Sequence, residues 1–423
     1  MLAGCGSSNP GGDDPPTYWA DVKPILDARC AGCHVAGGIG GFALDDYAGA
    51  AEWSRPVQIV VLAESMPPWL ASDDVAYAYD WSLTSEQIAT IHAWVEAGVP
   101  EGDPADEGAA LPYLGSELSR ADLVVQMPEP YVPTVDGSDD YRCFPLEWPQ
   151  DTSSFITGFN ALPGNDELVH HVAAFLIDAD NLLGDEVFEQ LQAWDADEPD
   201  PGYSCFGGPS GPTGDLELPI QQIAQWVPGS QGLDFPEGTG IRVDPGAWIV
   251  LQIHYASPST TLDDASDQTS IELRLDDNVE RTAAFAPWLD ALWALGNMEI
   301  PAGEVTSYTA EGDPRALFEL LNPALDLDEG FTIHSVMVHM HQLGDRAEVR
   351  LIRADGTEVP LLDIPNWDFD WQLSYQLETP VEVVPGDNLS LTCTFDNPTD
   401  EPVTWGEGTD DEMCVANLFI SHP

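Results

Sequence analysis

From about residue 118 to its end, the chain consists of short strand-like runs separated by Pro, Gly, Asn and Asp. Such runs are typical of β-sandwiches and jelly rolls, whose strands are short and end at turn residues. Helical periodicity is brief in this region, as near 184–194. About 300 residues are enough for two such domains, and we place their join near residue 280. The clearest strand-like runs are 247–255, 270–275, 331–341, 348–352 and 389–395.

The charge of the chain excludes several classes of partner. Its 423 residues include 74 Asp and Glu but 12 Lys and Arg, and the formal net charge is −62. No basic surface can neutralise phosphates, so nucleic-acid binding is excluded. The hydrophobic content of 43% is sufficient for packed cores. No apolar run approaches the roughly 20 residues of a spanning helix, so we expect membrane attachment only through a lipid anchor.

The first residues suggest such an anchor. Leu2-Ala3-Gly4-Cys5 resembles the lipobox of bacterial lipoproteins, in which a diacylglycerol is attached to the cysteine. A Pro/Gly/Asp-rich stretch follows, so we interpret 1–16 as lipobox and tether. This predicts an exported lipoprotein of the bacterial cell envelope, periplasmic or on the surface. The charged and apolar parts of a signal peptide are absent, so the alternatives are a true start upstream or a chance match.

A second cysteine motif predicts a haem. Cys30-Ala31-Gly32-Cys33-His34 is C-x-x-C-H, the attachment motif of c-type haem. Its two thiols would form thioethers to the porphyrin, and His34 would ligate the iron. A redox C-x-x-C and half of a zinc site are the alternatives. Neither requires the trailing histidine, and the sequence has no second C-x-x-C to complete a zinc site.

The surroundings of this motif favour a small all-α domain over 17–102 that resembles cytochrome c. Residues 19–29 are expected to form a helix that leads into the motif. Residues 84–98 are expected to form a capped helix, with Thr84 or Ser85 as N-cap and the closing glycine beyond its end. A charged linker, 103–117, would follow this domain.

Met66 is the candidate for the sixth iron ligand. It precedes two prolines, which hold it on a stiff loop, and a thioether is a usual ligand of low-spin haem. His92 is the rival ligand. Its position in the middle of a predicted helix favours a surface or packing role instead. The prediction for this domain is therefore one covalently bound haem c between His34 and Met66.

Histidines of the β-rich region occur in arrangements that suit metal ligation. His339 and His341 are two residues apart on a predicted strand, so both face the same side and can chelate one ion. His170 and His171 are consecutive, so they can share an ion at a bulge, at a strand end, or if one of them binds through a different ring nitrogen. His254 ends an apolar strand, where a lone histidine is more often part of the core or rim.

Met413 supplies a soft atom to this region. A thioether with two imidazoles suits Cu(I), whereas three imidazoles serve both Cu(I) and Cu(II). Two copper sites of unequal softness are suited to a one-electron relay to an oxygen site. The ordinary alternative for Met413 is a core residue after an acidic surface turn. His334 points away from His339, so we expect it to be structural.

These motifs resemble, in order and spacing, those of the copper type II ascorbate-dependent monooxygenases, the family of peptidylglycine alpha-hydroxylating monooxygenase and dopamine beta-monooxygenase. The resemblance covers roughly 118–423 and implies two jelly-roll-like sandwich domains, 118–280 and 281–423, each holding one copper. The shared motifs are His170-His171, Gln252-x-His254-Tyr255, His339-x-His341 and Asp411-Glu412-Met413-Cys414. By resemblance, the electron-transfer copper is held by His170, His171 and His254. The oxygen-binding copper, at the catalytic site, is held by His339, His341 and Met413.

The resemblance also implies disulfides. In the family, the cysteine after the ligand methionine is bridged to an upstream strand, which is similar to Cys414 with Cys393. Cys143 lies in a family-like context, and Cys205 remains as its partner. Two bridges, two haem thioethers and one lipidated cysteine would account for the seven cysteines of the chain.

The implied reaction is hydroxylation of an activated C–H bond in a small organic substrate by O2. The external electron donor would be an ascorbate-like reductant or a redox protein, and we expect the fused haem to reduce the first copper site. In the peptide-amidating branch, an Arg and a Tyr grip a carboxylate. Met337 and Asn417 stand at those positions here, so a C-terminal glycine substrate is not expected. Three aromatic residues are candidates for lining an aromatic substrate pocket, although we expect them to pack in the core: Trp367, Trp371 and Tyr375.

Two rival functions follow from the same residues. One is a non-catalytic periplasmic copper and haem protein that only transfers electrons. The other is a zinc hydrolase, which requires a water-activating carboxylate beside the histidines and has no preference for Cu(I). Because both ligand sets are complete, the sequence favours the monooxygenase. It leaves the substrate, the physiological donor and the oligomeric state undetermined.

Overall fold

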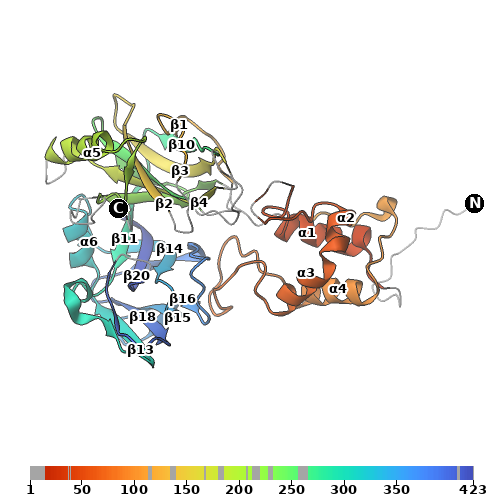
Figure 1. Ribbon diagram of the computed structural model, residues 1–423. Helices are drawn as coiled ribbons and strands as arrows, with labels where there is room; N and C mark the ends of the chain where they lie inside the picture. The colour runs from red at the N-terminus through yellow and green to blue at the C-terminus, as the bar shows by residue number, and fades with distance from the viewer. Residues whose placement is uncertain are drawn as a thin grey trace, which may run out of the picture. The chain divides into compact units, whose positions relative to one another are not determined.

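The computed structural model divides the chain into two compact units (Figure 1). The helical unit is 1–69 with 81–114, and the β unit is 70–80 with 115–423. Residues 1–14, which include Cys5, lie outside the described residues. Among the residues that the structure describes, no helix has the length and apolarity needed to cross a bilayer. The structure describes residues 15–36, 38, 40–112, 117–133, 140–165, 168–179, 185–205, 208–211, 220–226, 232–255, 265–406 and 410–422.

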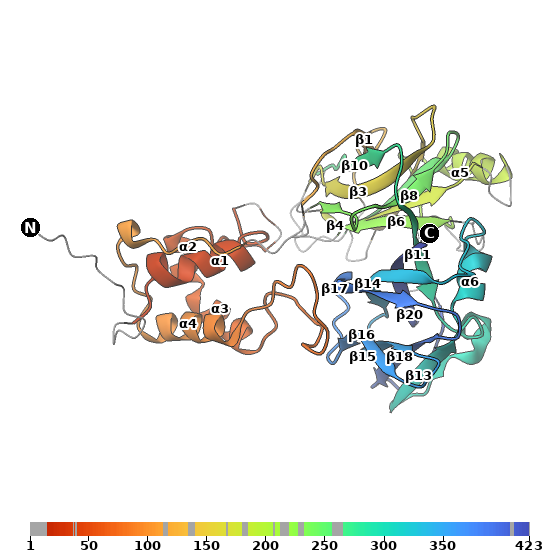
Figure 2. The same cartoon turned by 180° about the vertical axis from the view of Figure 1, so that it is seen from behind.

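The helical unit consists of short helices around a small core. Tyr18, Leu26 and Trp94 are buried in this core. Helices α3 and α4 contact each other and lie side by side in both views (Figures 1 and 2). The helices are the π-helix η1 (Tyr18–Val22), α1 (Lys23–Arg29), α2 (Tyr47–Glu52), α3 (Ser54–Leu62), α4 (Ser85–Glu96) and the 3₁₀-helix η2 (Pro104–Asp106).

Local signals located two of these helices correctly. Thr84 caps α4 in a capping box: its hydroxyl accepts the Gln87 N–H, and the Gln87 side chain accepts the Thr84 N–H. Gly98 follows with φ of +84°, a conformation that glycine adopts at little cost. The helix expected over 19–29 is present as η1 followed by α1, which ends directly before Cys30.

The first β domain is a sandwich around a large apolar core. Its five-stranded sheet has the order β5-β2-β9-β4-β6. The second layer is the β1-β10-β3-β8 part of a larger sheet, and side chains such as Ile156, Val172 and Leu251 fill the space between the layers. The elements are β1 (Leu123–Gln126), β2 (Asp140–Glu147), β3 (Ser154–Leu162), β4 (Val169–Ile177), α5 (Asp185–Asp197), β5 (Tyr203–Ser204), β6 (Gln221–Trp226), β7 (Leu233–Asp234), β8 (Thr239–Val243), β9 (Trp248–Tyr255) and β10 (Ser270–Asp276).

The second β domain repeats this two-layer design. One layer is β11-β20-β14-β17 and the other is β13-β18-β15-β16, as Figure 2 shows. Buried positions alternate along β18, as expected for a strand with one face on the core. The elements are β11 (Arg281–Trp288), the π-helix η3 (Trp293–Asn297), β12 (Glu299–Ile300), β13 (Glu304–Gly312), α6 (Arg315–Leu321), β14 (Phe331–His339), β15 (Gly344–Ile352), β16 (Glu358–Ile364), β17 (Tyr375–Val383), β18 (Asn388–Asn397), β19 (Val403–Thr404) and β20 (Val415–His422).

The boundaries differ from the predicted ones in two places. Residues 70–80 belong to the β unit, although the sequence placed them inside the helical domain 17–102. Their pairing with β17 is a single bridge, Tyr77 with Leu377, which is too short to produce a periodic pattern. Near residue 280 the chain does not separate two sheets, because β11 pairs in parallel with β8 and joins both domains into one nine-stranded sheet.

The structure contains both of the disulfides that were expected. Cys143 bridges Cys205, and Cys393 bridges Cys414. All four sulfur-bearing residues are buried. The second bridge ties β18 to the segment that enters β20. It therefore restrains the backbone directly after Met413.

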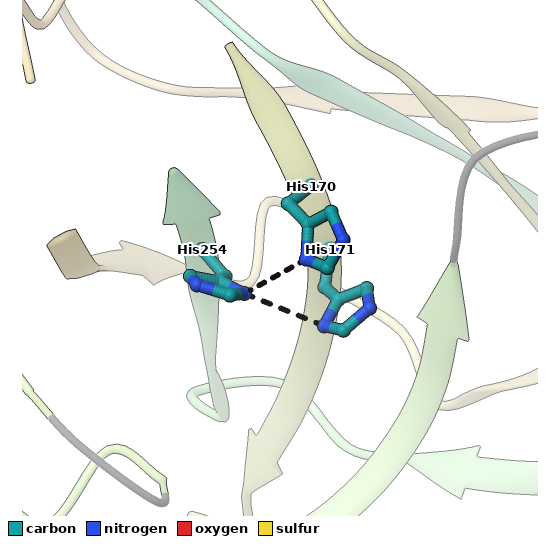
Figure 3. Close-up of side chains that lie close together, drawn as sticks. All are labelled: His170, His171 and His254. Carbon is teal, nitrogen blue, oxygen red and sulfur yellow. Dashed lines mark hydrogen bonds between the residues drawn. The ribbon is translucent and has the colours of Figure 1, made fainter. Parts of the chain in front are cut away.

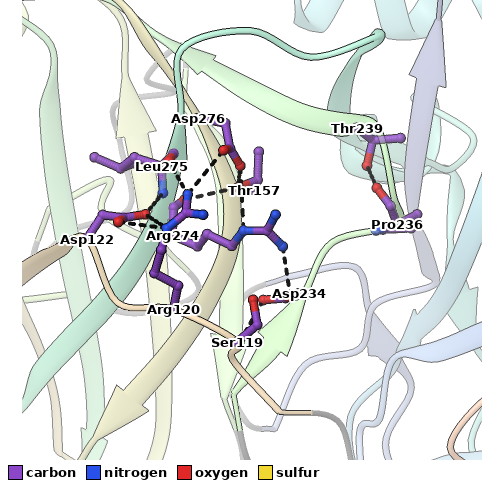
Figure 4. A network of polar contacts seen from close by, with 10 residues as sticks. All are labelled: Ser119, Arg120, Asp122, Thr157, Asp234, Pro236, Thr239, Arg274, Leu275 and Asp276. Carbon is purple, nitrogen blue, oxygen red and sulfur yellow. Dashed lines mark hydrogen bonds and ion pairs between the residues drawn. The ribbon is translucent and has the colours of Figure 1, made fainter.

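A polar network holds the edge of the first domain (Figure 4). Arg120 pairs with Asp122 and Asp276, and Arg274 pairs with Asp234 at 2.8 Å. These side chains remain partly exposed, so each pair contributes little to stability. Because their partners lie on β7 and β10 or just before β1, the network links neighbouring strands, and we assign it a structural role.

Candidate metal centres

Three histidines of the first β domain converge on one point (Figure 3). His170 and His171 lie on β4 and His254 lies on the neighbouring strand β9. The register of the two strands shifts between Val169 and His171. This irregularity turns two consecutive histidines to the same side, which a regular strand does not allow. A bulge is one of the conditions under which the sequence predicted that these residues can share an ion.

The ring nitrogens that converge are all Nδ1 atoms. His170 Nδ1 is 3.2 Å from His254 Nδ1, which in turn is 3.5 Å from His171 Nδ1. A proton can bridge one such pair, but three ring nitrogens around one point are better satisfied by a cation. The geometry therefore fits a metal bound by three Nδ1 atoms.

The surroundings keep the His171 ring neutral. Burial lowers the pKa of His171 well below its usual value, and the neighbouring His170, His254 and His339 lower it further. Metal binding requires neutral imidazole, so this shift favours ligation. Tyr141 of β2 stacks on His254 with ring centres 4.1 Å apart and planes 3° apart. Tyr141 was not predicted as part of this centre, because its partner is set by the β2–β9 register.

His339 and His341 form the second centre. Their Nε2 atoms are 3.1 Å apart. The Nδ1–H of His339 donates to the Gln372 side-chain oxygen, and the Nδ1–H of His341 donates to the Asp411 carbonyl at 2.9 Å. These acceptors place the ring protons on Nδ1, so both Nε2 lone pairs face the shared point. Burial lowers the pKa of His339 to about 4, which favours the neutral ring.

The strand register next to this centre predicts the position of Met413. His339 of β14 is paired with Val415 of β20. Extending this antiparallel register by two residues sets Met413 opposite His341, on the face that carries His339. Met413 is half-buried at the entry to β20. The register thus predicts that the three residues share one side of two neighbouring segments.

Glu412 is an unpredicted part of the second centre. This fully buried carboxylate accepts the backbone N–H of His341 at 2.8 Å and the N–H of Leu343 at 2.5 Å. Burial raises the pKa of Glu412 to about 7, and the backbone donors oppose that rise. The residue therefore holds the chain after β14 against the segment before β20.

The loop 365–374, between β16 and β17, supplies further contacts. Trp367 Nε1–H donates to the His341 carbonyl at 3.1 Å, and the Phe369 ring lies 6.2 Å from the His341 ring. Gln372 of the same loop is the acceptor for His339. Trp371 is half-buried and Tyr375 is fully buried, so Tyr375 has the packing role expected of it.

Comparison with known proteins agrees with this geometry. Residues 123–261 match the copper type II ascorbate-dependent monooxygenase N-terminal domain, and residues 318–422 match its C-terminal domain. Together the matches cover more than half of the chain. The chain belongs to the copper type II ascorbate-dependent monooxygenase family. Each matched region contains one of the two histidine sets.

Individual relatives support this membership. The chain is 28% identical over 265 residues to human "DBH-like monooxygenase protein 1", covering 60% of this chain and 40% of the relative. It is 26% identical over 345 residues to "Tyramine beta-hydroxylase" of Caenorhabditis briggsae, covering 75% and 51%. The chain thus spans about half the length of these relatives. A solved structure of PNGF-II matches with a TM-score of 0.25 and 9% identity over 71% of this chain and 65% of that chain, which carries no argument.

The two positions that correspond to the carboxylate-binding Arg and Tyr of the peptide-amidating branch form a cross-strand pair in this chain. Met337 and Asn417 lie directly opposite each other on β14 and β20. They share the face that carries His339. The Asn417 side-chain amide donates to the Gln222 side-chain oxygen at 2.8 Å. Neither residue is cationic, as the sequence indicated.

The candidate haem residues lie in the helical unit. Cys30 and Cys33 are unbridged and half-buried, and burial lowers the pKa of His34. Met66 is half-buried after α3. His92 is exposed on α4, where its Nδ1 lies 2.8 Å from the Gln58 amide nitrogen. This contact agrees with the surface role expected for His92.

His334 predicts one pH dependence of stability. It is buried, its Nε2 lies 2.8 Å from Ser421 Oγ, and burial together with the charge of Arg281 lowers its pKa to about 4. An unfolded histidine has a pKa near 6.5, so the contribution of neutral His334 is present above that pH. It is lost as pH falls through 4, by at most about 3 kcal/mol.

Urea unfolding of metal-free protein between pH 7 and pH 4 measures this contribution. We expect His334→Gln to lose less stability over that interval than the wild type, because glutamine does not titrate. Parallel curves for the two proteins would contradict the assignment.

Proposed function

We propose that this protein is a copper-dependent monooxygenase that hydroxylates an activated C–H bond of a small organic substrate. The overall change is R–H + O2 + 2 e⁻ + 2 H⁺ → R–OH + H2O. The observation that carries the proposal is the pair of imidazole sets in one unit, one offering Nδ1 atoms and the other Nε2 atoms. The names of the monooxygenase and hydroxylase relatives agree with this reaction class.

The residues present fit two copper ions. His170, His171 and His254 would hold the electron-transfer copper, and His339, His341 and Met413 would hold the oxygen-binding copper. When bound, the two coppers would supply the electrons and the site at which O2 reacts. Neutral rings and a thioether form the soft set that Cu(I) prefers.

The chain's own contribution is preorganisation. Gln372 and the Asp411 carbonyl fix the protons of His339 and His341 on Nδ1, which leaves Nε2 available. Glu412 fixes the backbone of His341. A ligand set held in this way does not need to rearrange when the metal binds.

The substrate is proposed to be uncharged where it meets the second centre. Met337 and Asn417 share the strand face of His339, two cross-strand pairs further along. An amide can donate or accept hydrogen bonds but cannot neutralise a carboxylate. We therefore expect hydroxyl- or amide-bearing small molecules rather than peptides that end in a free carboxylate.

The electron donor is proposed to be a haem c in the helical unit, which would then be a cytochrome c domain. Cys30 and Cys33 would bind the porphyrin, and His34 and Met66 would ligate its iron. Support comes from the motif and from the unbridged state of these two thiols beside two complete disulfides. An ascorbate-like reductant or another redox protein would be the external donor that supplies electrons to the chain.

Attachment of haem c outside the cytoplasm agrees with the proposed export of this chain as a Cys5 lipoprotein.

The relay is tested with the full chain carrying reduced haem and Cu(II) in both centres, in the absence of dithionite. Haem oxidation on the timescale of turnover is expected. Haem that stays reduced would contradict the relay.

The reaction itself is tested with purified, copper-loaded full chain. Metal analysis is expected to give two coppers per chain, and reaction with a panel of neutral substrates, reductant and ¹⁸O2 is expected to give a product that is one labelled oxygen atom heavier. The chelated protein is the control. Two bound coppers without labelled product or oxygen consumption above the chelated control would favour the electron-transfer alternative, and bound zinc would favour a hydrolase.

A further inference from the structure

Residues 70–80, which we call the arm, add to the edge of the nine-stranded sheet. The Ala78 N–H donates to the Gln376 carbonyl at 2.9 Å, and the Glu378 N–H donates to the Ala76 carbonyl at 3.0 Å. These bonds form an antiparallel bridge on β17, which is the last strand of that sheet. The arm thus occupies backbone positions that an edge strand otherwise leaves open.

The arm also contacts the other sheet of the second β domain. The Ser72 N–H donates to the Asp363 carbonyl at 2.8 Å. The Tyr77 hydroxyl donates to the Leu361 carbonyl at 3.2 Å. Both acceptors lie on β16, which belongs to the four-stranded sheet. The arm therefore bridges two sheets through main-chain groups on each.

Its contacts flank one loop on both sides. β16 ends at Ile364 and β17 begins at Tyr375, so the arm holds both stems of the loop 365–374. Tyr375 is fully buried, its hydroxyl accepts the Leu70 N–H at 3.3 Å, and its ring lies 5.4 Å from the Tyr77 ring. The loop between these stems carries Gln372, the acceptor for His339.

The chain at either end of the arm belongs to the helical unit. The rings of Trp69 and Trp81 meet edge to face at 5.9 Å, and Trp81 Nε1–H donates to the Pro68 carbonyl at 3.1 Å. These contacts close the base of the arm. Met66, the candidate iron ligand, is two residues before Pro68.

The geometry points to the arm as a positioning element for the second metal centre. By fixing both stems of the loop 365–374, it holds Gln372 against His339 and Trp367 against the His341 carbonyl. The arm acts within the β unit, to which its residues belong. The inference rests on the proposed function for the identity of the metal, but not for the position of the loop.

Two arm variants of the full chain test whether the arm positions the loop 365–374 or only covers the β17 edge of the sheet. Ala78→Pro removes the N–H that Gln376 accepts, and Tyr77→Phe removes only the hydroxyl that reaches β16. Asp73→Ala is the matched control, because Asp73 is an exposed residue of the same arm. If Ala78→Pro fails to fold, Tyr77→Phe keeps the test open.

The first measurement is hydrogen exchange of the metal-free proteins. Loss of one hydrogen bond is expected to speed exchange of the loop 365–374 about fivefold in Ala78→Pro and less in Tyr77→Phe. The control is expected to match the wild type. Unchanged exchange of this loop in both variants would overturn the inference, whether or not the protein binds copper.

The second measurement is Cu(I) affinity at each centre, from competition with a chelator. Both arm variants are expected to weaken binding at the His339 centre, by about tenfold in Ala78→Pro, and to leave the His254 centre unchanged. Faster loop exchange with unaltered affinity at both centres would reduce the arm to an edge cover and overturn the inference. Failure of the wild type to bind copper at either centre would instead refute the proposed function.

Discussion

The His339→Ala variant is expected to lose at least about 100-fold of the wild-type rate of product formation. Loss of an outer-shell partner of a metal ligand already costs about 10–100-fold, and His339 is itself one of the proposed ligands. Met413→Ala is expected to follow, with a larger loss of Cu(I) affinity than of Cu(II) affinity, because it removes the soft thioether. Oxygen consumption and labelled product are measured together.

The matched control for His339→Ala is His334→Gln, on the same strand but bonded to Ser421. It is expected to keep full activity near pH 7. Both ligand variants should retain the metal bound by His170, His171 and His254, which separates loss of one centre from unfolding. Equal oxygen consumption in wild type, His339→Ala and Met413→Ala would show background chemistry and favour the non-catalytic relay.

The Glu412→Ala variant is expected to lose about 3 kcal/mol of unfolding free energy. Its carboxylate accepts the buried N–H groups of His341 and Leu343, and alanine leaves both donors without this acceptor. The backbone after β14 would then be free to move away from Met413. Cu(I) affinity at this centre is therefore expected to fall by about 10–100-fold. Urea unfolding and chelator competition measure the two effects.

Two further variants calibrate this result. Asp410→Ala removes an exposed acidic residue of the same segment and is expected to match the wild type. Glu412→Gln keeps one accepting oxygen and should show an intermediate loss. Wild-type stability and copper affinity in Glu412→Ala would contradict the role assigned to this carboxylate.

Local patterns account for the elements that the sequence located. Thr84, Gln87 and Gly98 lie within one helix, so its cap and end can be derived from neighbours along the chain. The apolar alternation of β18 is likewise local. The arm shows the opposite case: one bridge to β17 has no periodicity, and its partner is about 300 residues away.

The candidate centres divide in the same way. His339 and His341 share a strand face by spacing alone. His170 and His171 face the same side because of the register shift on β4, which was named from the sequence only as a possibility. Gln372 carried no signal of its own, and Glu412 stood in a shared motif without a role assigned to it. Each acts on a histidine 33 or 71 residues distant in the chain, and their hydrogen bonds exist only after the strands have paired.

Residue type and short spacing were sufficient to predict the chemistry that we propose for this chain: imidazoles in pairs, a thioether beside a cysteine, and thiols in C-x-x-C-H. These features depend on neighbours in the chain, so they are visible before folding. Which nitrogen of each ring faces the shared point, what fixes its proton, and which loop and arm support it were decided only by tertiary structure. The physical reason is that these contacts join strands whose register is set by packing across the whole β unit.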